Sequence, residues 1–286
     1  MGNLFSGLEK LGFGNLNDVK LFDEPAKKEA GEEKKQEVHK ASEVDMLFDK
    51  TYTCPVCGQE FKVKAVRAGR AKLDHMDSDL RPVFTPGDTT KYSAIVCPKC
   101  GYAALDRFFP NITFKQEKAI KENITPKFKG LKETGEIYTY EDAIERYQLV
   151  LLTTIVKGAK NSEKAYVCLK LAWLVRGMSE SLDPAAADTA AKKKELETEE
   201  LSYLSNAYEG FSKAVSSENF PLVGMDENTL AIVLGDTARK LGKRDEASRW
   251  LSSVITSRVA KNSVKEKARV IRDAMIEEDK KNGTAQ

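Results

Sequence analysis

The sequence predicts an α+β protein in which a small β-rich module precedes an all-α domain of packed helices. Three observations predict it: two identical cysteine motifs near residues 54 and 97, a run at 61–66 that alternates apolar and polar residues, and helical periodicity from residue 113 onward. Separate strand-rich and helix-rich regions are typical of this class. We therefore divide the chain into a flexible tail and charged linker at 1–45, a cysteine module at 46–112 and a helical domain at 113–282.

Length and composition indicate a globular protein. The chain has 286 residues, of which 41% are apolar and 31% are charged. Such a length suits two domains. No apolar run approaches the roughly 18 to 20 residues needed to span a bilayer, and the N-terminus lacks the basic and apolar regions of a secretory signal. We therefore expect a cytoplasmic protein without a membrane span.

The first segment, 1–45, is rich in charged residues. It holds 7 lysines and 10 acidic residues, and its stretch at 27–40 consists largely of Lys, Glu and Gln. Segments of this kind bury too little apolar surface to offset the entropy lost on ordering. This segment is therefore expected to be a tail and linker.

Two motifs of the form Cys-Pro-x-Cys-Gly carry the strongest chemical signal. They contain Cys54 with Cys57, and Cys97 with Cys100. The spacing lets both sulfurs of a tight turn face one cation, and the glycine can adopt the positive φ that directs backbone N–H groups at sulfur. Four thiolates complete the tetrahedral shell of a structural zinc site and leave no open position. We predict one structural Zn²⁺ ion bound by all four, in a zinc-ribbon-like module.

A Cys-Pro-x-Cys unit also resembles a thiol–disulfide active site, so a zinc-linked redox switch is an alternative. A redox site normally needs one pair with a lowered thiolate pKa. Two matched pairs favour the metal, because closely spaced cysteines in a reducing compartment are typically ligands. The fifth cysteine, Cys168, lies in an apolar helical stretch and is expected to be a buried small residue.

The two motifs lie farther apart than the roughly 15 to 20 residues of compact zinc sites, so we place an insertion at 67–91. It is polar and contains Arg67, Arg70, Lys72, His75, Asp77 and Asp79. One interpretation is a second metal site or an acid–base group made by His75, Asp77 and Asp79. We favour a structural role, in which the acids pair with arginines and order a long loop.

Nucleic-acid binding is a further candidate, because residues 46–130 hold 15 Lys and Arg against 9 acids. Arg67, Arg70 and Lys72 could contact phosphates. Four aromatic side chains could stack on bases or form the core of the module: Tyr92, Tyr102, Phe108 and Phe109. The core is the favoured interpretation.

The sequence shows no catalytic set. The chain has two histidines, His39 in the linker and His75 in the insertion, and it has neither a P-loop nor a dinucleotide-binding glycine pattern. We therefore expect no enzymatic activity.

The second half carries helix signals throughout. We predict helices at 140–157, at 163–180 with Ser162 as N-cap, from 183 to near 221, and at 226–241, 245–258 and 263–279. Small and large apolar residues recur at equal offsets in three of them: Ala143, Tyr147 and Val150; Ala207, Phe211 and Ala214; Ala247, Leu251 and Val254. These offsets resemble those of tetratricopeptide repeats, although the regular period is broken. A plain helical bundle would show a similar core.

Together these features resemble a bacterial family of uncharacterised proteins, defined by a domain of unknown function. The resemblance rests on residues 54–61, on Arg67 with Asp77 and Asp79, and on residues 92–103, and it covers about 46–260. It implies a paired-cysteine zinc module followed by tetratricopeptide-like helices. It implies nothing about activity.

From these observations we expect a zinc-binding adaptor whose helical domain binds an unidentified protein or peptide. The alternatives are a nucleic-acid-binding zinc protein and a thiol-redox zinc switch.

Overall fold

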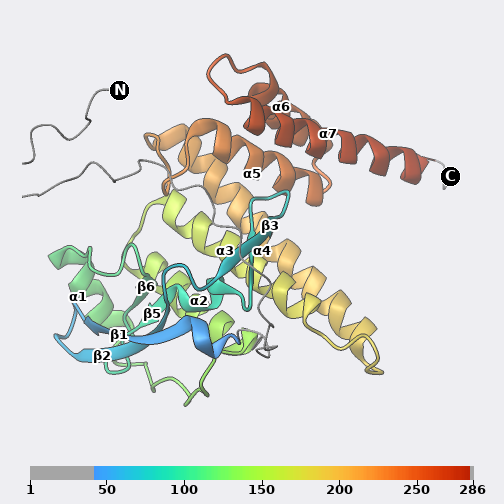
Figure 1. The fold of residues 1–286 in the computed structure, drawn as a ribbon. Coiled ribbons are helices and arrows are strands. Elements are labelled where there is room, and N and C mark those ends of the chain that lie inside the picture. The colour runs from blue at the N-terminus through green and yellow to red at the C-terminus, as the bar shows by residue number, and fades with distance from the viewer. Residues whose placement is uncertain (1–41, 284–286) are drawn as a thin grey trace, which may run out of the picture. The chain divides into compact units, whose positions relative to one another are not determined.

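The structure is a computed structural model, and it describes residues 42–283 (Figure 1). Most of the predicted tail and linker therefore lies outside the described residues. Three antiparallel hairpins come first: β1 (Leu47–Thr53) with β2 (Glu60–Val66), β3 (Lys72–Met76) with β4 (Pro82–Thr85), and β5 (Ala94–Val96) with β6 (Ala103–Leu105). Seven helices follow within the described range: α1 (Phe114–Asn123), α2 (Tyr140–Val156), α3 (Asn161–Glu180), α4 (Thr189–Ser217), α5 (Glu227–Lys240), α6 (Arg244–Thr256) and α7 (Asn262–Gly283). The chain is an α+β protein, as predicted.

The β1–β2 hairpin carries the first cysteine motif in the turn that joins its strands. The alternation at 61–66 predicted a half-buried strand, and β2 confirms it, because Val63 is buried and Lys62 is exposed. Tyr52 lies opposite Phe61 across the hairpin, and both rings pack edge-on against Phe109. These aromatic side chains are part of the core beneath the cysteines.

The β5–β6 hairpin carries the second cysteine motif and is buried on both faces. Ile95 and its partner Ala104 belong to the core that contains the cysteines. Ala94 and Val96, one residue to either side, belong to the core formed by α2 and α3. Because alternate side chains of a strand point to opposite faces, this short hairpin separates the two cores and contacts both.

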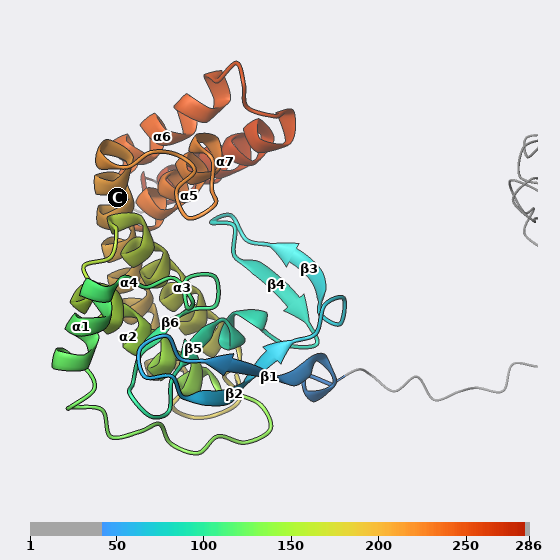
Figure 2. The same ribbon diagram turned by 90° about the vertical axis from the view of Figure 1, so that its left-hand side faces the viewer.

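The β3–β4 hairpin occupies the insertion, which was predicted to be a polar loop; that prediction is wrong. Every residue of β3 is exposed. An exposed strand does not need the alternation of apolar and polar residues by which a half-buried strand is recognised, so the sequence did not predict it. The strand forms because β4 pairs with it, in a register that shifts between Leu73 and His75. Figure 2 shows the hairpin beside the helices, apart from the β1–β2 hairpin.

Helix starts are set by side chains that accept hydrogen bonds from free backbone N–H groups. Thr113 and Thr139 form capping boxes at the starts of α1 and α2, and Asp226 caps α5 through the N–H of Thr229. The predicted cap at Ser162 is wrong, since α3 already begins at Asn161. The Ser162 hydroxyl instead donates to Glu218 at 2.5 Å. The helix predicted from residue 183 begins later, at Thr189, because 183–188 form turns.

The helical half packs each helix against its neighbours in sequence, with α3 and α4 in the most extensive contact. All nine residues of the repeated small–large pattern are buried. The crossing of α3 and α4 is close, because a Cβ built on Gly210 would lie 2.9 Å from the Cβ of Ala165. No helix within residues 42–283 combines the length and apolarity needed to traverse a lipid bilayer.

Candidate metal centre

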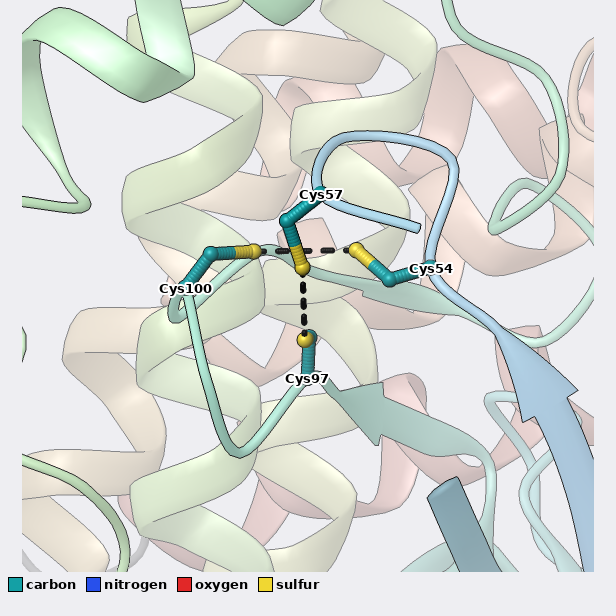
Figure 3. Close-up of side chains that lie close together, drawn as sticks. All are labelled: Cys54, Cys57, Cys97 and Cys100. Atoms are coloured by element: carbon teal, nitrogen blue, oxygen red, sulfur yellow. Dashed lines mark hydrogen bonds between the residues drawn. The ribbon is translucent and has the colours of Figure 1, made fainter. Parts of the chain in front are cut away.

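The turns of two hairpins bring the four predicted cysteine ligands together (Figure 3). The two turns share one backbone pattern. In each, the N–H of the glycine donates to the carbonyl of the first cysteine, at 2.9 Å for Gly58 and 3.0 Å for Gly101. Both glycines have positive φ, +71° and +73°, as the motif predicted. The repeated motif therefore folds into the same turn twice, and the two turns face each other.

The four sulfurs lie at the corners of a small polyhedron. The Sγ atoms of Cys54 and Cys100 are 3.6 Å apart, as are those of Cys57 and Cys97, and all four lie within 4.8 Å of one another. A sulfur–sulfur bond is about 2.05 Å long, so these are free thiols. A tetrahedral ion with metal–sulfur bonds of about 2.3 Å would place its ligands about 3.8 Å apart. The group can therefore hold one metal ion.

Burial opposes the ionisation of four adjacent thiols. Cys54, Cys97 and Cys100 are almost completely buried. A hydrogen bond from Cys100, together with N–H groups of Cys57 and Val56, lowers the pKa of Cys54, and the same bond raises the pKa of Cys100. Burial raises the pKa of Cys97. Ionisation of all four thiols is therefore disfavoured, and a bound divalent cation would compensate the charge of four thiolates.

Helix α1 and the chain after it support the second motif. The Thr125 hydroxyl donates to the carbonyl of Cys100 at 3.1 Å. Ile120 and Ile124 are buried in the core that contains the cysteines. These contacts could not be predicted from the sequence, because residues 113–128 carry no motif that points to the cysteines. The group of four cysteines is therefore held by its own two hairpins and also packs against α1 and the residues that follow it.

The candidate residues of the insertion divide into an exposed and a buried set. His75 is exposed at the surface, where its Nδ1 lies 2.7 Å from Asp74 and its Nε2 lies 3.4 Å from Asp77. The hydrogen bond to Asp74 raises the pKa of His75. Asp79 is fully buried. The structure therefore separates His75 from Asp79, and the three residues do not converge as metal ligands among the described residues.

Asp79 is the centre of a buried ion network. Its carboxylate accepts a hydrogen bond from Arg176 on α3 at 2.5 Å and one from Lys240 on α5 at 2.8 Å. Burial alone would raise the pKa of Asp79, but the charges of Lys240 and Arg176 outweigh it and hold this pKa well below its usual range. Asp79 therefore stays ionised and ties the turn of the β3–β4 hairpin to two helices.

Arg81 and Asp77 extend the network. Arg81 Nε donates to Asp77 at 2.6 Å, and Arg81 Nη2 donates to Glu180 at 2.7 Å. Arg176 reaches Asp77 and Glu200 as well. Arg67 and Arg70 do not take part. The helical partners lie about a hundred residues or more away in the chain, so sequence spacing gave no signal for Arg176 or Lys240.

The candidate nucleic-acid contacts also divide by exposure. Arg67, Arg70 and Lys72 are exposed, and Arg67 Nε donates to the carbonyl of Leu47 at 2.9 Å. Three of the four candidate stacking residues are buried: Tyr92, Tyr102 and Phe109. Phe108 is half-buried beneath the guanidinium of Arg107. The buried rings form the core of the module, as favoured, and are not free to stack on bases.

Comparison with known proteins gives one match. A family model described as an uncharacterized protein conserved in bacteria (DUF2225) matches residues 47–275. This range contains the four cysteines, the β3–β4 hairpin, the ion network and all of the helices except the end of α7. No curated protein and no solved structure matches the chain.

Proposed function

The chain belongs to this bacterial family, DUF2225, and we propose that it is a cytoplasmic adaptor in which a structural zinc ion stabilises the fold and the helical half binds another protein. The observation that carries the proposal is the buried group of four cysteine sulfurs, 3.6 Å apart in two pairs. A site closed by four thiolates has no position for a substrate, which favours a structural role.

Zinc is the metal that fits this donor set best. Four thiolates in a tetrahedral arrangement select zinc or iron. The two turns direct backbone N–H groups at Cys54 and at Cys97; at Cys54 these contribute to a lowered pKa, and at Cys97 they oppose the rise in pKa that burial causes. Because Zn²⁺ has no redox chemistry, it suits a site packed into a protein core.

The helical half is proposed to be a tetratricopeptide-like repeat. Its small–large residues are buried, and glycines lie at two helix crossings: Gly210 against Ala165, and Gly235 against Leu251. Close helix pairs that stack on one another build extended surfaces suited to peptides and proteins. This proposal accounts for a large helical half attached to a metal site that performs no chemistry of its own.

The adaptor proposal is tested by capture with the full-length, zinc-loaded protein at physiological salt, after nuclease treatment. We expect one protein to be retained in near-stoichiometric amount and to bind again as a purified component. Retention of nucleic acid in place of protein would contradict the proposal and favour the second candidate.

The second candidate is nucleic-acid binding, favoured by the exposure of Arg67, Arg70 and Lys72, which form no ion pair in the part of the chain described by the structure. Each phosphate contact contributes a slope of about −0.9 to the logarithmic salt dependence on duplex DNA. If this candidate holds, replacing all three by alanine should lower that slope by up to about 3. An unchanged slope would exclude these residues as the contact surface.

A further inference from the structure

A cavity of about 480 Å³ lies between the β3–β4 hairpin and helices α3, α5 and α7. The hairpin contributes Met76, Leu80 and Pro82 to its wall. Figure 2 shows the hairpin reaching across to the helical half. The volume falls within the range of about 300 to 1,000 Å³ that is typical of ligand-binding sites.

The lining of this cavity is largely apolar. Trp173 and Leu169 come from α3, and Ile232 and Val233 come from α5. Met76, one of the lining residues, remains 43% exposed. Exposed apolar side chains around a concave apolar surface are typical of a site that another molecule covers.

The charged residues that line the cavity are both lysines. Lys170 lies with its Nζ 5.1 Å from the ring of Tyr166 and 5.4 Å from the ring of Trp173. Lys267 lies with its Nζ 3.4 Å from the sulfur of Met76. Neither ammonium forms an ion pair with the residues that the structure describes, and the described lining contains no acidic side chain.

These two lysines differ from a lysine on the adjacent helix α5, whose ammonium is paired. Lys240, on the adjacent helix α5, is within 2.8 Å of Asp79 and 3.1 Å of Asp236. An ammonium beside apolar walls is poorly hydrated on that side, which strengthens its attraction to an anion. The cavity therefore combines an apolar surface with two cations that a carboxylate can pair with.

The ion network fixes the hairpin wall of the cavity in place. Asp79 is tied to α3 and α5, and its neighbour Ser78 donates to Asp236 on α5 at 2.8 Å. Leu80, which lines the cavity, lies between Asp79 and Arg81, and both of these belong to the network. A preformed wall lowers the entropy cost of binding, because little of it must be ordered by the ligand.

We propose that this cavity is the site at which the adaptor binds its partner, and that it takes a peptide segment with a bulky apolar side chain next to a carboxylate. The apolar side chain enters between Trp173, Leu80 and Ile232, and the carboxylate pairs with Lys170 or Lys267. A buried apolar anchor with polar contacts at the rim is the usual arrangement of the residues that dominate an interface. The proposal rests on the adaptor function and specifies its site.

The test is selection of random heptapeptides on the immobilised full-length protein. We expect the selected peptides to place Asp or Glu within two positions of Phe, Trp, Leu or Met. A synthetic copy of one selected peptide should change the fluorescence of Trp173 saturably in a Trp250→Phe background, because Trp173 is then the sole tryptophan.

Variants of the two lysines identify the site. The double variant Lys170→Met, Lys267→Met keeps the aliphatic shape and removes both charges, so it should bind the synthetic peptide about tenfold more weakly, equivalent to about 1.4 kcal/mol. Lys170→Glu with Lys267→Glu should shift the selection to peptides with Lys or Arg. The matched control is Lys192→Met with Lys193→Met, on the exposed face of α4, which should leave binding unchanged.

Selection without acidic residues, or equal binding by the double methionine variant and the wild type, would overturn the cavity proposal. A captured partner that binds the double methionine variant as tightly as the wild type would also overturn the cavity proposal, but it would support the adaptor function. Conversely, acidic peptides that bind here while no cellular protein is retained would support the cavity and contradict the adaptor.

Discussion

Asp79 is the residue on which the position of the β3–β4 hairpin depends most. It is completely buried and contacts cations from two helices that are remote in sequence. The free energy lost on removing one member of a buried ion pair is much larger than the stability that the intact pair contributes, because the remaining charge stays buried without compensation. The network is therefore a point at which a single substitution has a large effect.

Asp79→Asn should lower the free energy of unfolding by about 3 to 5 kcal/mol, because Arg176 and Lys240 would lose their shared carboxylate. Urea unfolding of the zinc-loaded wild type and variant measures this difference in the free energy of unfolding. Asp74→Asn is the matched control: its side chain is 61% exposed, and it should change stability by less than about 0.5 kcal/mol. Equal effects of the two substitutions would show that the network does not hold the hairpin.

The same network predicts a pH dependence. The pKa of Asp79 is lower in the folded protein than its value of about 3.9 in an unfolded chain. Its contribution to stability is therefore fully present above about pH 4 and is lost as the pH falls through the folded pKa. The difference in unfolding free energy between wild type and Asp79→Asn should be constant from about pH 5 to pH 8 and shrink below pH 4. A difference that increases on acidification would contradict this assignment.

At the scale of elements, the two cysteine turns provide an internal comparison. Gly58 and Gly101 have nearly the same positive φ and occupy equivalent positions. They differ in their surroundings: a Cβ on Gly58 would meet no atom within 4 Å, whereas a Cβ on Gly101 would lie 2.5 Å from Cγ of Phe128. Backbone strain acts at both positions, and steric overlap acts at one.

Gly58→Ala should therefore destabilise the protein by about 1 to 2 kcal/mol, the cost of a left-handed conformation in a residue with a Cβ. Gly101→Ala should cost more, because Phe128 must also move. Denaturant unfolding of both variants measures the difference. Phe128→Ala should reduce the extra cost when combined with Gly101→Ala, and the absence of such coupling would show that the ring is not the obstacle.

The elements that sequence reasoning predicted are those whose signals are local. Helix α5 is an example: Asp226 caps its start, and Gly242, which has a positive φ, follows its end. Both residue types are local sequence signals for the ends of a helix. Strand β3 carries no such signal, since its residues are exposed and it exists through pairing with β4. Ser162 had the right chemistry for a cap, but Glu218, distant in sequence, competes for its hydroxyl.

At the scale of the whole molecule, the group of four cysteines and the helical half share one folded unit. The β5–β6 hairpin contacts the cysteine core with Ile95 and the helical core with Val96. Sequence reasoning predicted the cluster of four cysteines because the motif is local and repeated. It predicted neither the ion network nor the cavity, because both are made by residues that meet only after the helices have packed on the hairpin.

Because the β5–β6 hairpin contacts both cores, loss of a bound metal should affect the helices as well as the hairpins. The binding free energy of structural zinc sites is on the order of 10 to 16 kcal/mol, which exceeds the usual stability of a domain, about 5 to 15 kcal/mol. We therefore expect chelation to remove fixed tertiary structure from the cysteine module and to lower the melting temperature of the helical half.

The most direct test is metal analysis of the purified full-length protein, with its circular dichroism followed before and after complete chelation. We expect one zinc ion per chain in the wild type and in Cys168→Ala, a control that removes the fifth cysteine, which lies apart from the group. Cys97→Ser should lose the zinc and unfold at a lower temperature than the wild type. A transition that stays at the same temperature after complete chelation, or four sulfurs isolated as disulfides, would contradict the structural zinc site.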